Sequence, residues 1–381
     1  MPGLVDTTLR EGAQAPVGYL DPGRQRELLA GVIRIGVEEI EVGHTAAEAT
    51  YDPEPVADLL DLAHDLDPGV RRALWCRARP DDLRAAAALR PEVVSFALPV
   101  SDLHLSRRLG RGHDWALAQV GRLVRIARDA GIGYVSVGCE DATRADTGFL
   151  AAVLRAARVA GADRIRIADT VGIAAPGELV ALVDLARRWF DGDVGVHLHD
   201  DFGMATAGAV AALQAGADWA DVSLTGLGER AGISRTEEVA GWYVARCGAD
   251  YDLRAARDIA RRLASWVGRP VPPQAPVVGA DLFTCESGLH LAGLVADPAT
   301  YEPYPPELVG ATRTWRLGRG AGRAAVAGLV GAAEPLAGAA RVRRAALARG
   351  RSLSVQECAD LLATPAEPAG PGPTEPAGRQ R

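Results

Sequence analysis

Residues 193–203 read D-V-G-V-H-L-H-D-D-F-G, and this stretch shows how the chain is built. It begins as a short apolar run, typical of a buried parallel strand, and it ends in two histidines and two acids. The alanine-rich segment that follows, 204–215, is predicted to be a helix. Because side chains alternate along a strand, His197 and His199 point to the same side, about 7 Å apart.

The same strand-then-helix pattern recurs along the chain. Strands are expected at 4–7, 37–42, 72–75, 93–97, 134–137, 164–168, 194–197 and 219–223, and helices at segments that include 22–35, 115–130, 176–190 and 236–247. Eight such units over about 250 residues predict an α/β fold of the (β/α)8 TIM-barrel type, with its chemistry at the strand carboxyl ends. An open doubly wound sheet is the alternative, but no G-x-G-x-x-G follows the first strand.

The composition changes after the expected barrel. Residues 1–268 are predicted to form the catalytic TIM-barrel domain. Between 269 and 362, proline- and glycine-rich connections surround short helical pieces, which predicts a small, mostly helical C-terminal subdomain that contributes to the active site. The last stretch, 363–381, contains the run T-P-A-E-P-A-G-P-G-P and is predicted to be a disordered tail.

The bulk composition excludes several classes of partner. Of the 381 residues, 48% are hydrophobic and 24% charged, and the net charge is −7 without long runs of one sign, so nucleic acid is not an expected partner. No apolar stretch reaches the roughly 18 residues of a membrane span, and the N-terminus lacks a basic-then-apolar signal. The five cysteines are scattered without a C-x-x-C pair, as expected for reduced thiols. We therefore expect a cytoplasmic protein.

One absence is more informative than the averages. The chain contains 42 arginines and no lysine. Schiff-base aldolases, pyridoxal enzymes, Walker-A phosphate loops and protein kinases all need a lysine amine, so these four classes are excluded. The D-F-G at residues 201–203 is therefore not a kinase motif.

Acid and imidazole side chains gather where the predicted strands end, in 6–12 (D-T-T-L-R-E-G), 168–172 (A-D-T-V-G) and 196–201 (V-H-L-H-D-D). Two strand histidines satisfied by neighbouring carboxylates are one interpretation of His197 and His199. With Glu11 they also make two imidazoles and a carboxylate, a facial set that binds a divalent metal. Non-haem iron oxygenases use the same set, but they usually have all-β scaffolds, so analogy of fold argues against them.

Six motifs in order along the chain carry a resemblance. They are D-T-T-L-R-E-G-A-Q (6–14), S-V-G-C-E-D-A-T-R-A-D (136–146), A-D-T-V-G (168–172), H-L-H-D-D-F-G-M-A-T-A (197–207), G-L-G-E-R-A-G (226–232) and E-S-G-L-H (286–290). From about residue 5 to about residue 329 the chain resembles the homocitrate synthase and 2-isopropylmalate synthase family. W-C-R-A-R (75–79) and L-P-V-S-D-L-H-L (98–105) look most like the homocitrate synthases of nitrogen fixation.

The resemblance implies a Claisen condensation, in which the enolate of acetyl-CoA adds to the ketone of a 2-oxo acid and the thioester is then hydrolysed. A divalent cation (Mg²⁺, Mn²⁺ or Zn²⁺) held by Glu11, His197 and His199 would act as a Lewis acid on the 2-oxo acid. Arg10 would stabilise the alkoxide that develops on the ketone oxygen. Thr170 would bind the 1-carboxylate, or else serve only as a helix cap after the strand.

The same resemblance suggests where the base lies. His290, in the motif E-S-G-L-H, is the expected base and Tyr301 its hydrogen-bonding partner. Both lie outside the barrel sequence, so they would close over its mouth, in their own subunit or in the neighbouring one of a homodimer. Glu140 is the barrel-side candidate for acid or base. Asp200 and Asp201 are expected to orient the histidines or to cap the next helix.

The substrate's far end is expected to meet basic groups. Gln14, Arg77, Arg79 and His104 are assigned to substrate binding, and two arginines favour a dianionic 2-oxo acid. The alternative is that at least one arginine is a surface group paired with Asp81 or Asp82, which are close to it in the sequence.

Homocitrate synthase, using acetyl-CoA and 2-oxoglutarate, is the leading hypothesis. Alternatives are a 2-phosphonomethylmalate synthase using 3-phosphonopyruvate, and an isopropylmalate- or citramalate-type synthase. A metal-dependent hydroxyacyl-CoA lyase is the hypothesis from another class, although the segment 226–232 lacks the cysteine such lyases use. The chain departs from the family pattern at several positions, among them Gly195, where homocitrate synthases commonly have glutamate, and Ser136, where the fungal type has arginine.

Overall fold

A computed structural model describes residues 2–48, 52–286 and 288–364. The chain divides into two compact units, Met1–Ala280 and Asp281–Arg381, which are described separately below. The predicted disorder of 363–381 falls almost entirely outside the described residues.

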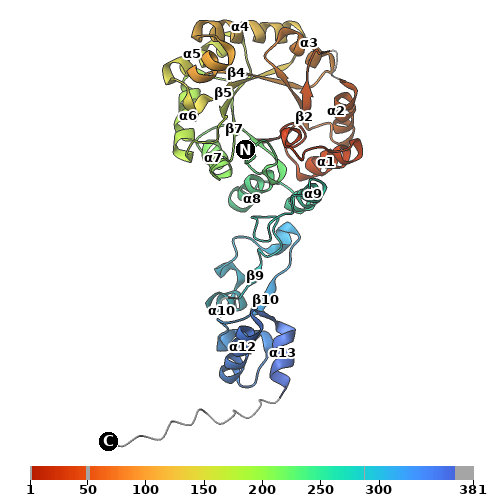
Figure 1. Cartoon of the computed structure of the whole chain (residues 1–381), viewed down its shortest axis with the longest axis vertical. Coiled ribbons are helices and arrows are strands. Elements are labelled where there is room, and N and C mark those ends of the chain that lie inside the picture. The colour runs from red at the N-terminus through yellow and green to blue at the C-terminus, as the bar shows by residue number, and fades with distance from the viewer. Residues whose placement is uncertain (1, 49–51, 287, 365–381) are drawn as a thin grey trace, which may run out of the picture. The chain divides into compact units, whose positions relative to one another are not determined.

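Eight parallel strands form a closed barrel in chain order, with β8 pairing back to β1, as Figure 1 shows. The strands are β1 (Gly3–Asp6), β2 (Glu39–Thr45), β3 (Arg71–Arg77), β4 (Val93–Pro99), β5 (Tyr134–Glu140), β6 (Arg164–Asp169), β7 (Asp193–Leu198) and β8 (Trp219–Val222). The predicted TIM barrel is thus confirmed, and each predicted strand overlaps an observed one.

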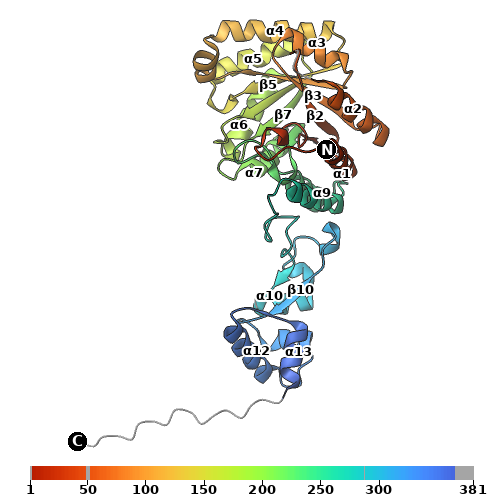
Figure 2. The same ribbon diagram turned by 45° about the vertical axis from the view of Figure 1, so that its right-hand side comes forward.

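Helices surround the barrel on its outside, as Figure 2 shows for α3, α4 and α5. They are α1 (Pro22–Ile35), α2 (Glu54–Leu66), α3 (Pro80–Ala88), α4 (His113–Asp129), α5 (Thr147–Ala160), α6 (Pro176–Trp189), α7 (Ala205–Gln214), α8 (Thr236–Cys247) and α9 (Leu253–Trp266). Short 3-10 or π segments interrupt four of the loops that follow strands: η1 (Gly12–Gln14), η2 (His104–Leu109), η3 (Ala142–Arg144) and η4 (Leu224–Gly226).

Local sequence signals set where these helices begin and end. The Asp21 carboxylate accepts a hydrogen bond from the backbone of Arg24 and caps α1, and Pro22 occupies the first turn. Gly36, at φ 90°, then ends α1 in the left-handed conformation that glycine adopts without strain. Asp146 caps α5 in the same way, and that helix also ends at a left-handed glycine, Gly161.

Near the amino ends of the strands, the barrel interior is charged and aromatic rather than aliphatic. Arg164 and Glu39 form a fully buried ion pair, with Nη2 2.7 and 2.8 Å from the two carboxylate oxygens. The Arg164 guanidinium also lies over the rings of Tyr134 and Trp219, at 5.2 and 4.9 Å from their centroids. A Cβ on Gly195 would lie 3.3 Å from Cδ of Arg164, so the long arginine occupies the space beside this glycine.

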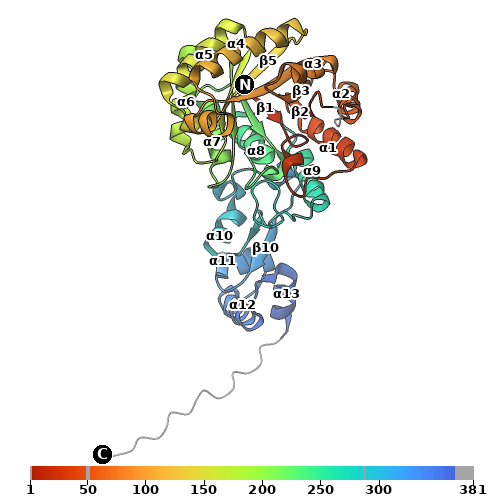
Figure 3. The ribbon, with the colours of Figure 1, turned by 45° about the horizontal axis from the view of Figure 1, so that its top comes forward.

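The C-terminal unit is small and mostly helical, as predicted, but it also contains a short three-stranded sheet in the order β11-β10-β9, which the sequence analysis did not predict. Its elements are β9 (Thr284–Cys285), α10 (Gly288–Ala296), η5 (Pro298–Thr300), η6 (Pro306–Val309), β10 (Thr314–Leu317), α11 (Arg323–Ala325), η7 (Val326–Val330), α12 (Pro335–Arg349), β11 (Leu353–Ser354) and α13 (Val355–Ala363). Helices α12 and α13 lie side by side against β10 (Figure 3), around a core that includes Leu291, Leu317 and Val342.

No single helix among the described residues is long and apolar enough to cross a membrane. The segments 323–330 and 335–349 meet the length and composition criteria only as a pair, and they are bent by 95° at their break.

Glu237 gives a pH-dependent test of this fold. It is buried in the first turn of α8 and accepts a 3.0 Å hydrogen bond from the backbone of Thr225. Burial raises the pKa of Glu237 to about 7, from an ordinary value of 4.5. Since the folded pKa is the higher one, the stability it contributes is full below pH 4.5 and is lost as the pH rises through 7.

We therefore expect Glu237→Gln to flatten the fall in unfolding free energy between pH 5 and pH 8, by up to about 3 kcal/mol. Denaturant unfolding at the two pH values measures this. Glu238→Gln is the control, because Glu238 is the next residue along and pairs with Arg235 at 2.9 Å. Parallel pH dependence in wild type and Glu237→Gln would contradict the prediction.

Candidate metal centre and active site

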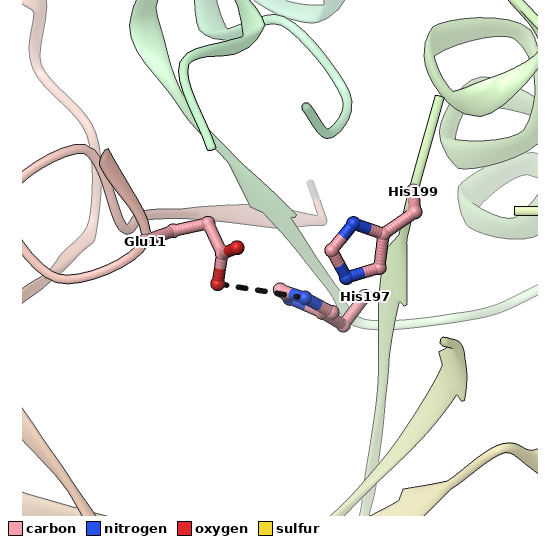
Figure 4. Close-up of side chains that lie close together, drawn as sticks. All are labelled: Glu11, His197 and His199. Carbon is pink, nitrogen blue, oxygen red and sulfur yellow. Dashed lines mark ion pairs between the residues drawn. The ribbon is translucent and has the colours of Figure 1, made fainter. Parts of the chain in front are cut away.

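Three buried side chains converge at the carboxyl end of the barrel. One ligand atom from each of Glu11, His197 and His199 lies within 4.8 Å of the others, and no other group of three such residues in the described part of the chain meets this spacing. Figure 4 shows Glu11, from the loop after β1, directed toward the imidazoles of His197, in β7, and His199, directly after β7. The sequence analysis grouped these residues correctly in space; their role as metal ligands stays a prediction.

The closure of the barrel brings Glu11 to this place. The backbone of Thr7 donates to the carbonyl of Val222 at 2.8 Å, which continues the β1–β8 pairing beyond the strands. The backbone of Glu11 then bonds back to the carbonyl of Thr7 at 2.7 Å in a tight turn. This turn aims the carboxylate across the barrel end toward β7.

His197 is oriented by a residue that the sequence analysis missed. Its Nδ1 lies 2.8 Å from Oδ2 of Asp221 on β8, which leaves Nε2 directed toward Oε2 of Glu11 at 3.9 Å. A carboxylate on one nitrogen of a histidine fixes the tautomer and the ring orientation that a metal ligand needs. Asp221 is an acid at an inward-facing position of a predicted strand, and this was the signal available in the sequence.

Neither Asp200 nor Asp201 forms a hydrogen bond to the histidines; the predicted capping of the next helix is seen at Asp200, and Asp201 instead pairs with an arginine. Asp200 accepts a hydrogen bond from the backbone of Ala205, the first residue of α7, at 2.9 Å. Asp201 accepts two 3.0 Å hydrogen bonds from Arg230.

The three converging residues fit a divalent cation. Oε1 of Glu11 and Nδ1 of His199 are buried and have no hydrogen-bond partner among the described residues. Burial alone would raise the pKa of Glu11, but Arg10 and the two histidines outweigh it and lower that pKa. Burial, together with His197, lowers the pKa of His199 to about 4. The group thus combines an ionised carboxylate with a neutral imidazole, the forms that bind metals.

Arg10 lies beside this group and is almost completely buried. Its Nε donates to Glu41 on β2 at 2.6 Å, its Nη1 pairs with Glu11, and its guanidinium lies 5.9 Å from the ring centroid of Trp75. Burial by itself would lower the pKa of Arg10, but the charges of Glu41 and Glu11 raise it overall, so the group is a permanent cation. A guanidinium has five N–H donors, so Arg10 retains donors beyond these two contacts.

Gln14 and Thr170 lie near the same end. The Gln14 amide donates to Oε2 of Glu11 at 3.3 Å, so in this structure Gln14 contacts a candidate ligand. The Thr170 hydroxyl accepts a 2.8 Å hydrogen bond from the backbone of Asp141. Thr170 is not a helix cap, because α6 begins at Pro176 with Ala175 as its N-cap. Its hydroxyl hydrogen is still available as a donor.

Glu140 is held by an arginine that the sequence analysis did not single out. Both of its oxygens accept from Arg108 of η2 at 2.6 Å, in a bidentate pair. His104 approaches the same carboxylate, with Nδ1 3.4 Å from Oε1. This pair engages both oxygens of Glu140 in the observed conformation, which leaves neither oxygen free to contact a substrate there.

The two arginines of β3 and its exit differ in their surroundings. Arg77 donates to Asp82 at 2.6 and 3.1 Å and also pairs with Glu48. At Arg77 the structure therefore has the alternative arrangement, in which the arginine pairs with Asp82. Arg79 is 63% exposed at its side chain and lies 3.7 Å from Glu48.

His290 and Tyr301 belong to the C-terminal unit and lie together. His290 is in α10, Tyr301 follows η5, and their ring centroids are 4.2 Å apart at an interplanar angle of 37°. Both side chains are exposed in this unit. The two residues are therefore neighbours through a ring contact, whereas the hydrogen bond between them and their catalytic roles stay predictions.

Comparison with known proteins identifies the family. A family model described as HMGL-like matches residues 2–262, and one described as homocitrate synthase post-HMGL domain-like matches residues 277–344. A homocitrate synthase of Frankia alni is 40% identical over 323 residues, covering 84% of this chain and 90% of that protein. The chain belongs to the HMGL-like family, in its homocitrate and isopropylmalate synthase branch. The family expected from the six motifs is thus confirmed, and with it the prediction of an enzyme.

Relatives named for other products are nearly as similar. A 2-phosphonomethylmalate synthase of Streptomyces rubellomurinus is 35% identical, over 85% of this chain and 86% of that protein. Isopropylmalate and citramalate synthases reach 36% identity. An HMG-CoA lyase of Bacillus subtilis has the same fold, with a TM-score of 0.60 at 19% identity over 71% of this chain and 95% of that one.

Removal of a converging ligand should abolish tight metal binding. We expect Glu11→Gln and His199→Gln each to weaken Co²⁺ binding by more than about 100-fold. Loss of a ligand lowers metal affinity more than loss of a residue that hydrogen-bonds to a ligand, which lowers it by about 10- to 100-fold. The Co²⁺ absorbance on titration measures the affinity. His64→Gln, on the exposed face of α2, is the control. Equal affinity in wild type and both ligand variants would refute the metal site.

Proposed function

We propose that this chain condenses acetyl-CoA with a 2-oxo acid in a Claisen reaction followed by thioester hydrolysis. The observation that carries the proposal is the buried group of Glu11, His197 and His199, beside Arg10, at the end of a barrel where this fold has its active sites. Membership of a family of synthases supports the same reaction.

In this proposal the side chains at the barrel end have different roles in the reaction. A divalent cation, Mg²⁺, Mn²⁺ or Zn²⁺, held by the three ligands would supply Lewis acidity toward the 2-oxo acid. Arg10, fixed by Glu41 and Glu11, directs its remaining N–H donors at the oxygen on which negative charge develops. Thr170, whose hydroxyl accepts from Asp141 N–H, donates its hydrogen to the substrate's 1-carboxylate.

The C-terminal unit supplies the base in this proposal. His290 removes a methyl proton from acetyl-CoA, and the adjacent Tyr301 orients its ring. His290 is exposed within its own unit, as a group that acts on another surface must be. Glu140 is the weaker alternative because Arg108 engages both of its oxygens. We propose a homodimer as the working form.

2-Oxoglutarate is the proposed 2-oxo acid, which makes the chain a homocitrate synthase. The relative from Frankia alni supports this choice, and Arg79 and His104 are the groups proposed to meet the distal carboxylate. Gln14 is placed with them as a contact to the substrate. 3-Phosphonopyruvate is the second candidate, supported by the Streptomyces relative. The five free cysteines are consistent with a cytoplasmic enzyme.

Thiol release from acetyl-CoA tests the reaction and the substrate together. With purified enzyme we expect release with 2-oxoglutarate, faster than with 3-phosphonopyruvate, pyruvate or 2-oxoisovalerate, and loss of release when a chelator removes the metal. A preference for 3-phosphonopyruvate would change the substrate alone. Absence of metal-dependent release with all four acids would refute the synthase.

Substitution of His290 separates catalysis from metal binding. We expect His290→Gln to lower kcat by about 10²–10⁴-fold, the usual contribution of a general base, with Co²⁺ affinity unchanged. Tyr301→Phe should lower kcat less, because it keeps the ring beside His290. An activity of His290→Gln close to that of wild type would reassign the base, with Glu140→Gln as the next variant to assay.

A further inference from the structure

A closed ring of buried side chains includes two of the three candidate metal ligands, Glu11 and His197. It runs from Glu11 to Arg10, from Arg10 Nε to Glu41 at 2.6 Å, and from Glu41 to Arg166 at 3.2 Å. It continues from Arg166 Nη1 to Asp221 at 3.1 Å and from Asp221 to Nδ1 of His197 at 2.8 Å. His197 Nε2, 3.9 Å from Glu11, completes it. Each member is at least nine-tenths buried.

Arg166 is the member that joins the two halves of this ring. Glu41 accepts a hydrogen bond from Arg10, which in turn pairs with Glu11. Asp221 is hydrogen-bonded to His197. Arg166, on β6, pairs with both carboxylates, and in the described part of the chain it forms no hydrogen bond or ion pair with any of the three candidate ligands. Its guanidinium can bond two acids at once because its donors form a rigid, planar fork.

We propose that Arg166 is a positioning residue for the metal centre, acting through Asp221 on His197 and through Glu41 on Arg10. The inference rests on the metal site of the proposed function and adds a residue to it. A buried carboxylate without a cation is strongly disfavoured, so without Arg166 the Asp221 side chain would leave its present position or acquire water. The His197 ring would then lose the contact that fixes its orientation.

A matched control stands two residues away on the same strand. Arg164 is also buried, also points into the barrel and also pairs with a β2 glutamate, Glu39, at 2.7 Å. Among the described residues its hydrogen bonds go to Glu39 and its ring contacts to Tyr134 and Trp219, all outside the ring, and it reaches Asp221 through its charge alone. Loss of either arginine removes one buried cation, but only Arg166 connects to His197.

The test is a Co²⁺ titration of the full-length protein, followed by the visible absorbance of the bound ion, on Arg166→Met, Arg164→Met and Asp221→Asn. We expect Arg166→Met and Asp221→Asn to weaken Co²⁺ binding by about 10- to 100-fold, the range for partners of metal ligands, and to change the absorbance bands. Arg164→Met should lower the melting temperature comparably to Arg166→Met but leave the affinity and bands unchanged.

Equal affinity in wild type and Arg166→Met, or an equal loss in Arg164→Met, would overturn the proposal. If Arg166→Met does not fold, Asp221→Asn decides, because it keeps the shape of the side chain: unchanged binding overturns the proposal. Failure of the proposed synthase function gives a different result from failure of the role proposed for Arg166. Wild type that binds Co²⁺ but condenses no 2-oxo acid would refute the synthase alone, whereas wild type that binds no Co²⁺ would refute the shared metal site.

Discussion

The pairing of β8 with β1 is the constraint on which the site depends. It fixes Gly3 opposite Trp219 and Asp6 opposite Val222, and the backbone bond from Thr7 extends the pairing. Glu11 and the histidines lie at opposite ends of the barrel's chain order, so no local structure brings them together. Only a closed barrel places the loop after the first strand beside the end of the seventh.

Closure also encloses an interior, and in this barrel that interior holds several charges. This barrel has Glu39, Glu41, Arg164 and Arg166 inside it, where most barrels of this fold have branched aliphatic side chains. Buried ion pairs of this kind add little to stability once desolvation is counted, but breaking one is costly. Their benefit therefore lies in geometry: each carboxylate is held at a fixed place by an arginine. The absence of lysine agrees with this use, because a guanidinium holds two acids in one plane.

The sequence predicted the features that follow from the hydrophobic pattern and from the order of the strands along the chain. It did not predict the contacts that depend on how neighbouring strands align. Eight strands followed from alternating patterns, and the grouping of Glu11, His197 and His199 followed from strand ends meeting at one face of the barrel. Asp221 and Arg166 were missed because their meeting requires knowing how β6, β7 and β8 align. Glu140 was predicted as an acid or base without its partner, since Arg108 comes from a π-helical segment that no pattern in the sequence indicated.

The same pairing of charges bears on substrate choice. At the described barrel end Arg77 is engaged by Asp82 and Glu48, Arg108 by Glu140, and Arg144 by Asp141. A dianionic substrate must therefore either meet the more weakly engaged Arg79 and His104 or replace one of these carboxylates as an arginine's partner. Replacement costs little if the displaced acid turns to water, as exposed Glu48 can. In the proposed function, selection among 2-oxo acids by this chain therefore depends on how firmly the acids at the barrel mouth hold their arginines.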